Sequence, residues 1–171
     1  MRKSLIFSLI LLLFASPAMA NDAVQKHVIN AQQVGTGRLS LVFWDVYDVT
    51  LYAPNGKWDA HKPYALSIHY FREIEGADIA KRSVEEMKKQ GFLDQVKLAD
   101  WQLQMRQIFP DVKNGSELTA VFTPQESTDF YSDGKHIGNI MGAEFGTYFF
   151  NIWLSEKTSE PELRKKLLGL I

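Results

Sequence analysis

The residues best suited to ligand chemistry are two arginines and two tyrosines in the first half of the chain. Arg38 opens a long segment rich in β-branched and aromatic residues, Tyr47 and Tyr52 lie further along it, and Arg72 closes the next such segment. A guanidinium binds a carboxylate through two parallel charge-assisted hydrogen bonds, and an apolar layer behind it would hold a hydrocarbon chain or a ring. We therefore expect a ligand site at Arg38 with Tyr47, Tyr52 and Arg72 nearby. The alternative is that Arg38 faces solvent, as an arginine at a strand start usually does.

The familiar signatures of catalysis and metal binding are missing from the sequence. The four histidines, His27, His61, His69 and His136, are far apart, and none belongs to a paired motif such as H-E-x-x-H. There is no G-x-S-x-G sequence, which disfavours a serine hydrolase. We expect no metal and no cofactor.

Composition narrows the class of protein further. The 171 residues correspond to one domain, and 46% apolar with 23% charged residues is typical of a globular protein. The absence of cysteine excludes disulfides, thiolate metal sites and a lipid anchor on an N-terminal cysteine. A net charge of −1 gives no indication of nucleic-acid binding.

The first 20 residues have the pattern of a secretory signal peptide. Arg2 and Lys3 form a positive start, an apolar run covers 5–14, and Ala18-Met19-Ala20 fits a cleavage site. The run is too short to span a bilayer comfortably, since a helix needs about 20 residues. The sequence thus predicts a signal peptide at 1–20 and a single domain at 21–171. We expect that domain to be periplasmic or secreted, without stable membrane insertion.

Hydrophobic patterning predicts strands first and helices last in the remaining chain. Gly35-Thr36-Gly37 reads as a turn, and Ser159-Glu160-Pro161-Glu162 as a capping box that starts a last helix. Expected strands are 24–34 (weakly), 39–53, 64–71, 117–123 and 129–131, with a short strand after a 132–135 turn; expected helices are 76–90, 97–109 and 143–154. Without β-α-β alternation, this order favours an α+β fold, an antiparallel sheet with helices packed on one side.

Several short motifs, taken together, resemble the chalcone isomerase-like family. They are G-T-G-R at 35–38, V-Y-D-V-T-L-Y at 46–52, R-E-I-E-G at 72–76, D-G-K at 133–135 and F-F-N-I-W-L at 149–154. The last two are similar to the end of its secreted bacterial branch. The resemblance covers about 28–168 and implies an open-faced β-sandwich: a large antiparallel sheet, a layer of helices, and a ligand cleft between them.

The resemblance also implies two classes of activity. Plant members cyclise chalcones to flavanones, and related plastid members bind fatty acids; in both, an arginine near the start of the long strand meets the anionic part of the ligand, and Arg38 is its counterpart. This chain has Tyr47 in place of the isomerase threonine, and Ile79 and Glu86 in place of a tyrosine and an asparagine that orient the substrate ketone. Chalcone isomerisation itself is therefore not expected.

Three hypotheses for function remain. The first is a non-catalytic protein that binds a small amphipathic carboxylate, such as a fatty acid, in the cleft. The second is an isomerase or lyase for another enone or phenolic, with Tyr47, Tyr52 or His69 as proton carriers. The third is a structural envelope protein whose cleft is closed by Trp44 or Phe149 and whose surface meets a protein partner.

Overall fold

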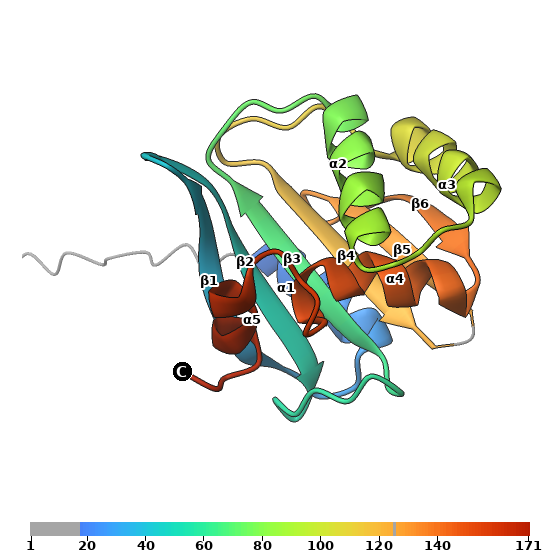
Figure 1. The fold of residues 1–171 in the computed structure, drawn as a ribbon. Helices are drawn as coiled ribbons and strands as arrows, with labels where there is room; N and C mark the ends of the chain where they lie inside the picture. Colours follow the sequence, from blue (N-terminus) through green and yellow to red (C-terminus); the bar gives the residue numbers. More distant parts are fainter. Residues whose placement is uncertain (1–17, 125) are drawn as a thin grey trace, which may run out of the picture.

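The computed structural model describes residues 18–124 and 126–171 and contains one antiparallel sheet with helices on both of its faces (Figure 1). Most of the predicted signal peptide lies outside the described residues. In chain order the elements are α1 (Ala18–His27), β1 (Ala31–Leu41), β2 (Trp44–Pro54), β3 (Tyr64–Tyr70), α2 (Gly76–Lys89), α3 (Gln95–Ile108), β4 (Glu117–Thr123), β5 (Ser127–Ser132), β6 (Lys135–Met141), α4 (Ala143–Leu154) and α5 (Pro161–Leu167).

The six strands lie side by side in the order in which they occur in the sequence, β1 to β6. The β5–β6 hairpin uses the predicted turn, in which Asp133 and Gly134 have φ values of 47° and 78°. Two positive φ values are what a type I′ hairpin turn requires, and Asp-Gly tolerates them. The prediction of an α+β fold with an open antiparallel sheet is confirmed.

The structure corrects the expected elements at the start of the chain. The weak strand predicted at 24–34 is the end of helix α1 followed by β1, because Val24 and Val28 are one helical turn apart and both are buried. The strand predicted at 39–53 is the end of β1 and most of β2, joined by a turn at Val42-Phe43. The expected helices at 76–90, 97–109 and 143–154 are confirmed to within two residues.

Gly35-Thr36-Gly37 is part of strand β1 rather than a turn, and the reason is helix α5. A Cβ atom on Gly37 would lie 2.6 Å from Leu163 Cδ1, and one on Gly35 would overlap the carbonyl of Lys166. The two glycines therefore let α5 approach the strand closely. The predicted capping box is also wrong: Glu160 is the N-cap residue and makes no side-chain cap hydrogen bond.

Two separate apolar clusters hold the layers together. The larger one joins one face of the sheet to residues of α2, α3, α4 and α5. The smaller one places Val24 of α1 and Val28, which directly follows α1, against Ala65 and Val121 on the opposite face. Helices therefore cover both faces, not the one face that strand order suggested. None of the helices in the described parts of the chain has the length and hydropathy to cross a bilayer.

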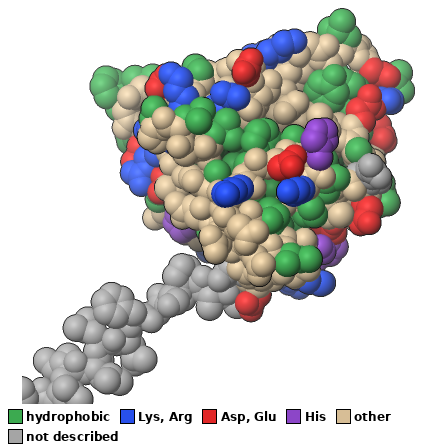
Figure 2. Space-filling view, turned by 90° about the horizontal axis from the view of Figure 1, so that it is seen from below, with side chains coloured by type: hydrophobic (Ala, Val, Ile, Leu, Met, Phe, Trp, Pro, Cys, Tyr) green, Lys and Arg blue, Asp and Glu red, His purple; other side chains and the backbone are tan. Residues whose placement is uncertain are grey.

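The surface carries charges of both signs. On the face shown in Figure 2, Lys and Arg side chains lie among Asp and Glu side chains, with hydrophobic side chains between them. This mixture agrees with the small net charge of the sequence.

Candidate functional site

A cavity of about 330 Å³ lies between the sheet and the helices of the larger apolar cluster. Strands β1 to β5 form its floor, with Tyr47, Ile68 and Ala120 among the residues that face it, and α2 and α4 form its cover. Pairing of Ile68 with Leu118, and of Leu66 with Ala120, brings one face of β3 and β4 together beneath it. Because alanine is small, Ala120 leaves room that a larger side chain would fill.

Aromatic rings make up one part of the cavity wall. Phe109 contacts Phe130 edge to face at a centroid distance of 5.0 Å, and Phe130 meets Phe149 in the same manner at 5.3 Å. All three are buried, and all three line the cavity. Edge-to-face packing keeps rings in fixed positions, so this wall is rigid and apolar.

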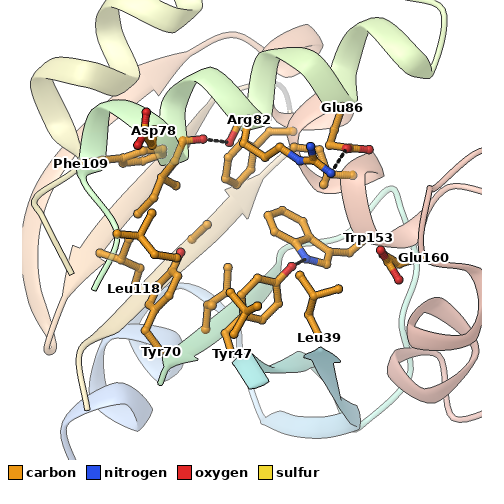
Figure 3. Close-up of a pocket in the computed structure, with 18 of the residues that line it drawn as sticks. Leu39, Tyr47, Tyr70, Asp78, Arg82, Glu86, Phe109, Leu118, Trp153 and Glu160 are labelled. Atoms are coloured by element: carbon orange, nitrogen blue, oxygen red, sulfur yellow. Dashed lines mark hydrogen bonds and ion pairs between the residues drawn. The ribbon is translucent and has the colours of Figure 1, made fainter. Parts of the chain in front are cut away.

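Polar groups gather where α2 faces the loop before α5. Arg82 and Glu86 project from α2, one helical turn apart, and the Arg82 guanidinium lies 3.1 Å from a Glu86 carboxylate oxygen (Figure 3). Glu86 also accepts hydrogen bonds from Lys89 Nζ at 2.8 Å and Ser159 Oγ at 2.7 Å. Its side chain is 8% exposed, whereas that of Arg82 is 63% exposed. The cavity thus combines an apolar interior with a polar edge that includes the exposed Arg82 and the carboxylates of Asp78, Glu86 and Glu160.

Opposing effects set the pKa of Glu86. Burial raises it, but the hydrogen bonds from Lys89 and Ser159 and the charges of Lys89 and Arg82 outweigh burial, so the pKa lies below its usual value. Glu86 is therefore ionised at neutral pH. The Glu86 carboxylate would still be hydrogen-bonded if Arg82 moved away, because Lys89 and Ser159 also donate to it.

Tyr47 and Trp153 point toward each other across the cavity from β2 and α4 (Figure 3). Trp153 Nε1 donates a hydrogen bond to Tyr47 Oη at 2.9 Å. Burial raises the pKa of Tyr47 to about 12, so its hydroxyl stays protonated at neutral pH. A protonated hydroxyl can donate to an oxygen of a ligand in the cavity, but it is a poor general base.

Arg38 lies outside this cavity. It precedes the cavity-lining Leu39 on β1, and its guanidinium donates to Asp48 at 2.7 and 2.9 Å and to Asp45 at 2.7 Å. These two hydrogen-bonded carboxylates raise its pKa further above the usual value. Its side chain is 47% exposed and lies 4.7 Å from the centre of the Phe71 ring.

Of the four predicted site residues, Tyr47 lines the cavity and the other three do not. Tyr52 is half-buried against the smaller apolar cluster, and burial raises the pKa of its hydroxyl. The Arg72 guanidinium lies 4.2 Å from the centre of the Trp44 ring. The structure therefore does not bring Arg38, Tyr52 and Arg72 together around Tyr47. Ligand contacts by these three residues stay predictions.

The sequence analysis did not single out Arg82. The signal was present in the spacing: Arg82 follows the cavity-lining Ile79 by three residues and precedes Glu86 by four. Ile79 and Glu86 both line the cavity. Within 18–124 and 126–171, no group of three or more His, Asp or Glu side chains is arranged to hold a metal ion.

Comparisons with known proteins agree with this geometry. The model of a family described as chalcone isomerase-like matches residues 21–169. Among solved structures, a fatty-acid binding protein of Arabidopsis thaliana is similar, with a TM-score of 0.63 and 13% sequence identity over 83% of this chain and 88% of that chain. At this identity the likeness shows a shared fold. A search of curated proteins gave no match.

Proposed function

The chain belongs to the chalcone isomerase-like family, and we propose that it binds a small amphipathic carboxylate of the fatty-acid class in its cavity without converting it chemically. The observation that carries this proposal is the apolar cavity of about 330 Å³ with Arg82 at its edge. The fatty-acid binding of the Arabidopsis thaliana neighbour supports the same class of ligand.

The cavity volume sets the size of the ligand. A protein cavity of about 150 Å³ accommodates benzene, which has six carbons. By the same ratio, about 330 Å³ accommodates roughly a dozen carbons. Burial of that chain contributes about 0.8 kcal/mol per methylene, or roughly 9–10 kcal/mol before ordering costs are subtracted. Micromolar affinity, which corresponds to about 8 kcal/mol, is within reach.

Two donors are available to the head group of such a ligand. Arg82 can turn from Glu86 toward a ligand carboxylate, since Lys89 and Ser159 still satisfy Glu86. The Tyr47 hydroxyl accepts from Trp153 and keeps its own proton free to donate. A carboxylate held by Arg82 forms charge-assisted hydrogen bonds, which are stronger than neutral ones.

A titration with saturated fatty acids of increasing length tests the size and the head group together. Affinity is expected to rise with chain length up to about 12 carbons and then to level off. Arg82→Ala should lower the affinity for dodecanoate by about tenfold, with little effect on dodecanol. Arg106→Ala, which removes an exposed arginine from α3 outside the cavity lining, is the matched control and should change neither.

Ala120→Leu tests whether the chain occupies the cavity. Leucine adds three carbons to the cavity floor, so the preferred ligand should become shorter by about three carbons while the protein stays folded. Equal affinities for all chain lengths, in both the wild type and this variant, would contradict the proposal.

A second candidate function is an isomerase or lyase that acts on an enone or phenolic. The observation in its favour is Tyr47, which faces the cavity with a protonated hydroxyl. Tyr52 and His69, the other two candidate proton carriers, do not line the cavity. Incubation with chalcone-like and other enones, followed by absorption spectra, separates this candidate from simple binding. The closed cleft of the structural hypothesis is disfavoured by the volume of the cavity.

We also propose that the protein is exported and belongs to a secreted bacterial branch of the family. Support comes from the signal-peptide pattern of residues 2–20, and from the buried residues Ala23, Val24 and Val28 of the N-terminal segment, which all follow the expected cleavage point. Cell fractionation with N-terminal sequencing tests this proposal, and the expected mature start is Asn21. A cytoplasmic chain that begins at Met1 would refute it.

A further inference from the structure

The end of the β1–β2 hairpin exposes four consecutive apolar side chains, which we term the apolar tip: Leu41, Val42, Phe43 and Trp44. Their exposed fractions are 53%, 87%, 90% and 60%. Figure 1 shows this end of the hairpin extending away from the body of the sheet. Single exposed apolar residues are ordinary on a protein surface, whereas a contiguous group of them marks a contact surface.

The turn at the apolar tip is built from residues that hairpin formation alone does not favour. Val42 and Phe43 occupy a two-residue turn, and Val42 has a φ of 56°. A β-branched residue is unfavourable at positive φ, where Asn-Gly or Asp-Gly is the usual choice. The Asp133-Gly134 turn of the β5–β6 hairpin shows the ordinary solution in the same protein. The tip therefore accepts both strain and exposure, as functional segments do.

The size and shape of the apolar tip favour a lipid surface over a protein partner. Large side chains contribute at most about 150–250 Å² each, so four partly exposed ones present on the order of 500 Å². A stable protein interface needs about 800 Å² on each side. A narrow convex hairpin end has no complementary flat surface around it, but it can insert between the head groups of a fluid bilayer.

The charges beside the apolar tip fit a neutral bilayer. Arg38 is neutralised by Asp45 and Asp48, and Arg72 lies over the Trp44 ring. Counted as formal charges, these two arginines and two aspartates cancel. Trp with neighbouring arginines is characteristic of the boundary between lipid and water, where the ring is buried and the guanidinium stays hydrated.

The apolar tip is continuous with the cavity. Leu41 at the tip and Val46 just beyond it both line the cavity, together with Leu39, which is two residues before Leu41 on β1. We propose that the tip inserts into the interfacial layer of a lipid bilayer and brings the cavity to the surface from which its amphipathic ligand is taken up. The uptake part of this inference rests on the proposed function, whereas the insertion part stands on the tip alone.

Flotation with vesicles of phosphatidylcholine tests insertion. The wild type is expected to float with the vesicles, and raising NaCl from 50 to 500 mM should leave the bound fraction unchanged, because no net charge drives the contact. The double variant Val42→Asn/Phe43→Gly removes the two most exposed tip residues and installs the preferred turn, so it keeps the hairpin. Its partition coefficient should be at least tenfold lower than that of the wild type.

Two further variants show that the apolar tip itself is responsible. Leu93→Ser/Val96→Ser removes two side chains that are 78% and 81% exposed elsewhere, and it should float like the wild type. Trp44→Phe should also float, but without the blue shift of tryptophan fluorescence that the wild type shows on binding. Loss of the blue shift would show that Trp44, rather than one of the other three tryptophans, enters the lipid.

Three results would overturn the inference. They are failure of the wild type to float with phosphatidylcholine, equal flotation of the wild type and the Asn-Gly variant, and a wild-type dimer that the Asn-Gly variant converts to monomer in sedimentation. The last result would make the tip a contact between two copies of the chain. Titration of dodecanoate in lipid-free buffer separates the two proposals, because the Asn-Gly variant should bind it like the wild type. Fatty-acid binding without flotation would leave the proposed function standing and refute the membrane contact.

Discussion

Replacing Glu86 by glutamine is expected to weaken the fold and to strengthen ligand binding in the same variant. The carboxylate is 8% exposed and lies 2.7–3.1 Å from Ser159 Oγ, Lys89 Nζ and Arg82 Nη2. A buried hydrogen bond to a charged group is worth about 1.5–3 kcal/mol. Arg82 and Lys89 are more than half exposed, which reduces each ion pair to about 0–1 kcal/mol, and glutamine can still accept from Ser159. We therefore expect a loss of about 1.5 kcal/mol.

Thermal unfolding measures this loss and its dependence on pH. For a domain of this size, about 1.5 kcal/mol corresponds to a decrease in Tm of roughly 3–6 °C at pH 7. Because the pKa of Glu86 in the folded state lies below its usual value of 4.5, its stabilisation is present above pH 4.5 and is lost as the pH falls through the folded-state pKa. The difference between the wild type and Glu86→Gln should therefore disappear in acid.

The same substitution should raise the affinity for dodecanoate several-fold, since Arg82 no longer has a carboxylate beside it. Glu85→Gln is the matched control: Glu85 is 45% exposed and lies 3.8 Å from Arg82, so its removal should change Tm by less than about 1 °C. A Tm of Glu86→Gln equal to that of the wild type at pH 7, or a lower affinity for dodecanoate, would refute this account of the site.

Other substitutions test other parts of the structure. Tyr47→Phe leaves the Trp153 indole N–H without its acceptor, so unfolding free energy should fall by about 1–2 kcal/mol and the indole proton should shift upfield in NMR spectra; an unchanged indole signal would argue against the bond. Gly37→Val places a side chain of β1 against Leu163 of α5. Hydrogen exchange of the backbone amides of 161–167 should then show at least tenfold lower protection, whereas full protection would contradict close packing of α5. Burial raises the pKa of Glu117 despite hydrogen bonds from Ser67 and Thr119. The charged carboxylate therefore lowers stability at neutral pH, and this loss disappears as the pH falls through the raised pKa. Glu117→Gln should increase Tm by about 1–3 °C at pH 7 and by less near pH 4, whereas a decrease at pH 7 would show that the hydrogen bonds outweigh burial.

Elements with a local signal could be predicted from the sequence with nearly correct bounds. Helix α2 has apolar residues at spacings of three and four and ends just before Gly91, whose φ of 98° suits a residue that follows a helix. Strand β4 and helix α4 have the predicted bounds, because each is a short apolar segment between turn residues. For these elements, periodicity and capping contain the required information.

The features of the structure that could not be predicted from the sequence depend on contacts between residues far apart in the chain. The hairpin turn at Val42-Phe43 contains no turn residue, so 39–53 looked like one strand. That turn brings Asp45 and Asp48 beside Arg38, where they form ion pairs that the sequence did not predict. Arg82 borders the cavity only because α2 crosses the sheet at that point. Residue types suggested an arginine beside apolar walls, but which arginine borders the cavity depends on tertiary packing.

Close packing of α5 on β1 has a consequence for the order in which the chain folds. Neighbouring strands of the sheet are also neighbours in sequence, so most strand pairs can form without a long loop having to close, although β3 and β4 are separated by α2 and α3. The contact of Leu163 with Gly37 instead joins opposite ends of the domain, so it requires a much longer loop to close. Until that contact forms, the part of β1 that α5 covers is exposed to solvent. A chain that stops before 161 would have all six strands but would lack this cover, and the exposed apolar surface would make it more prone to aggregate.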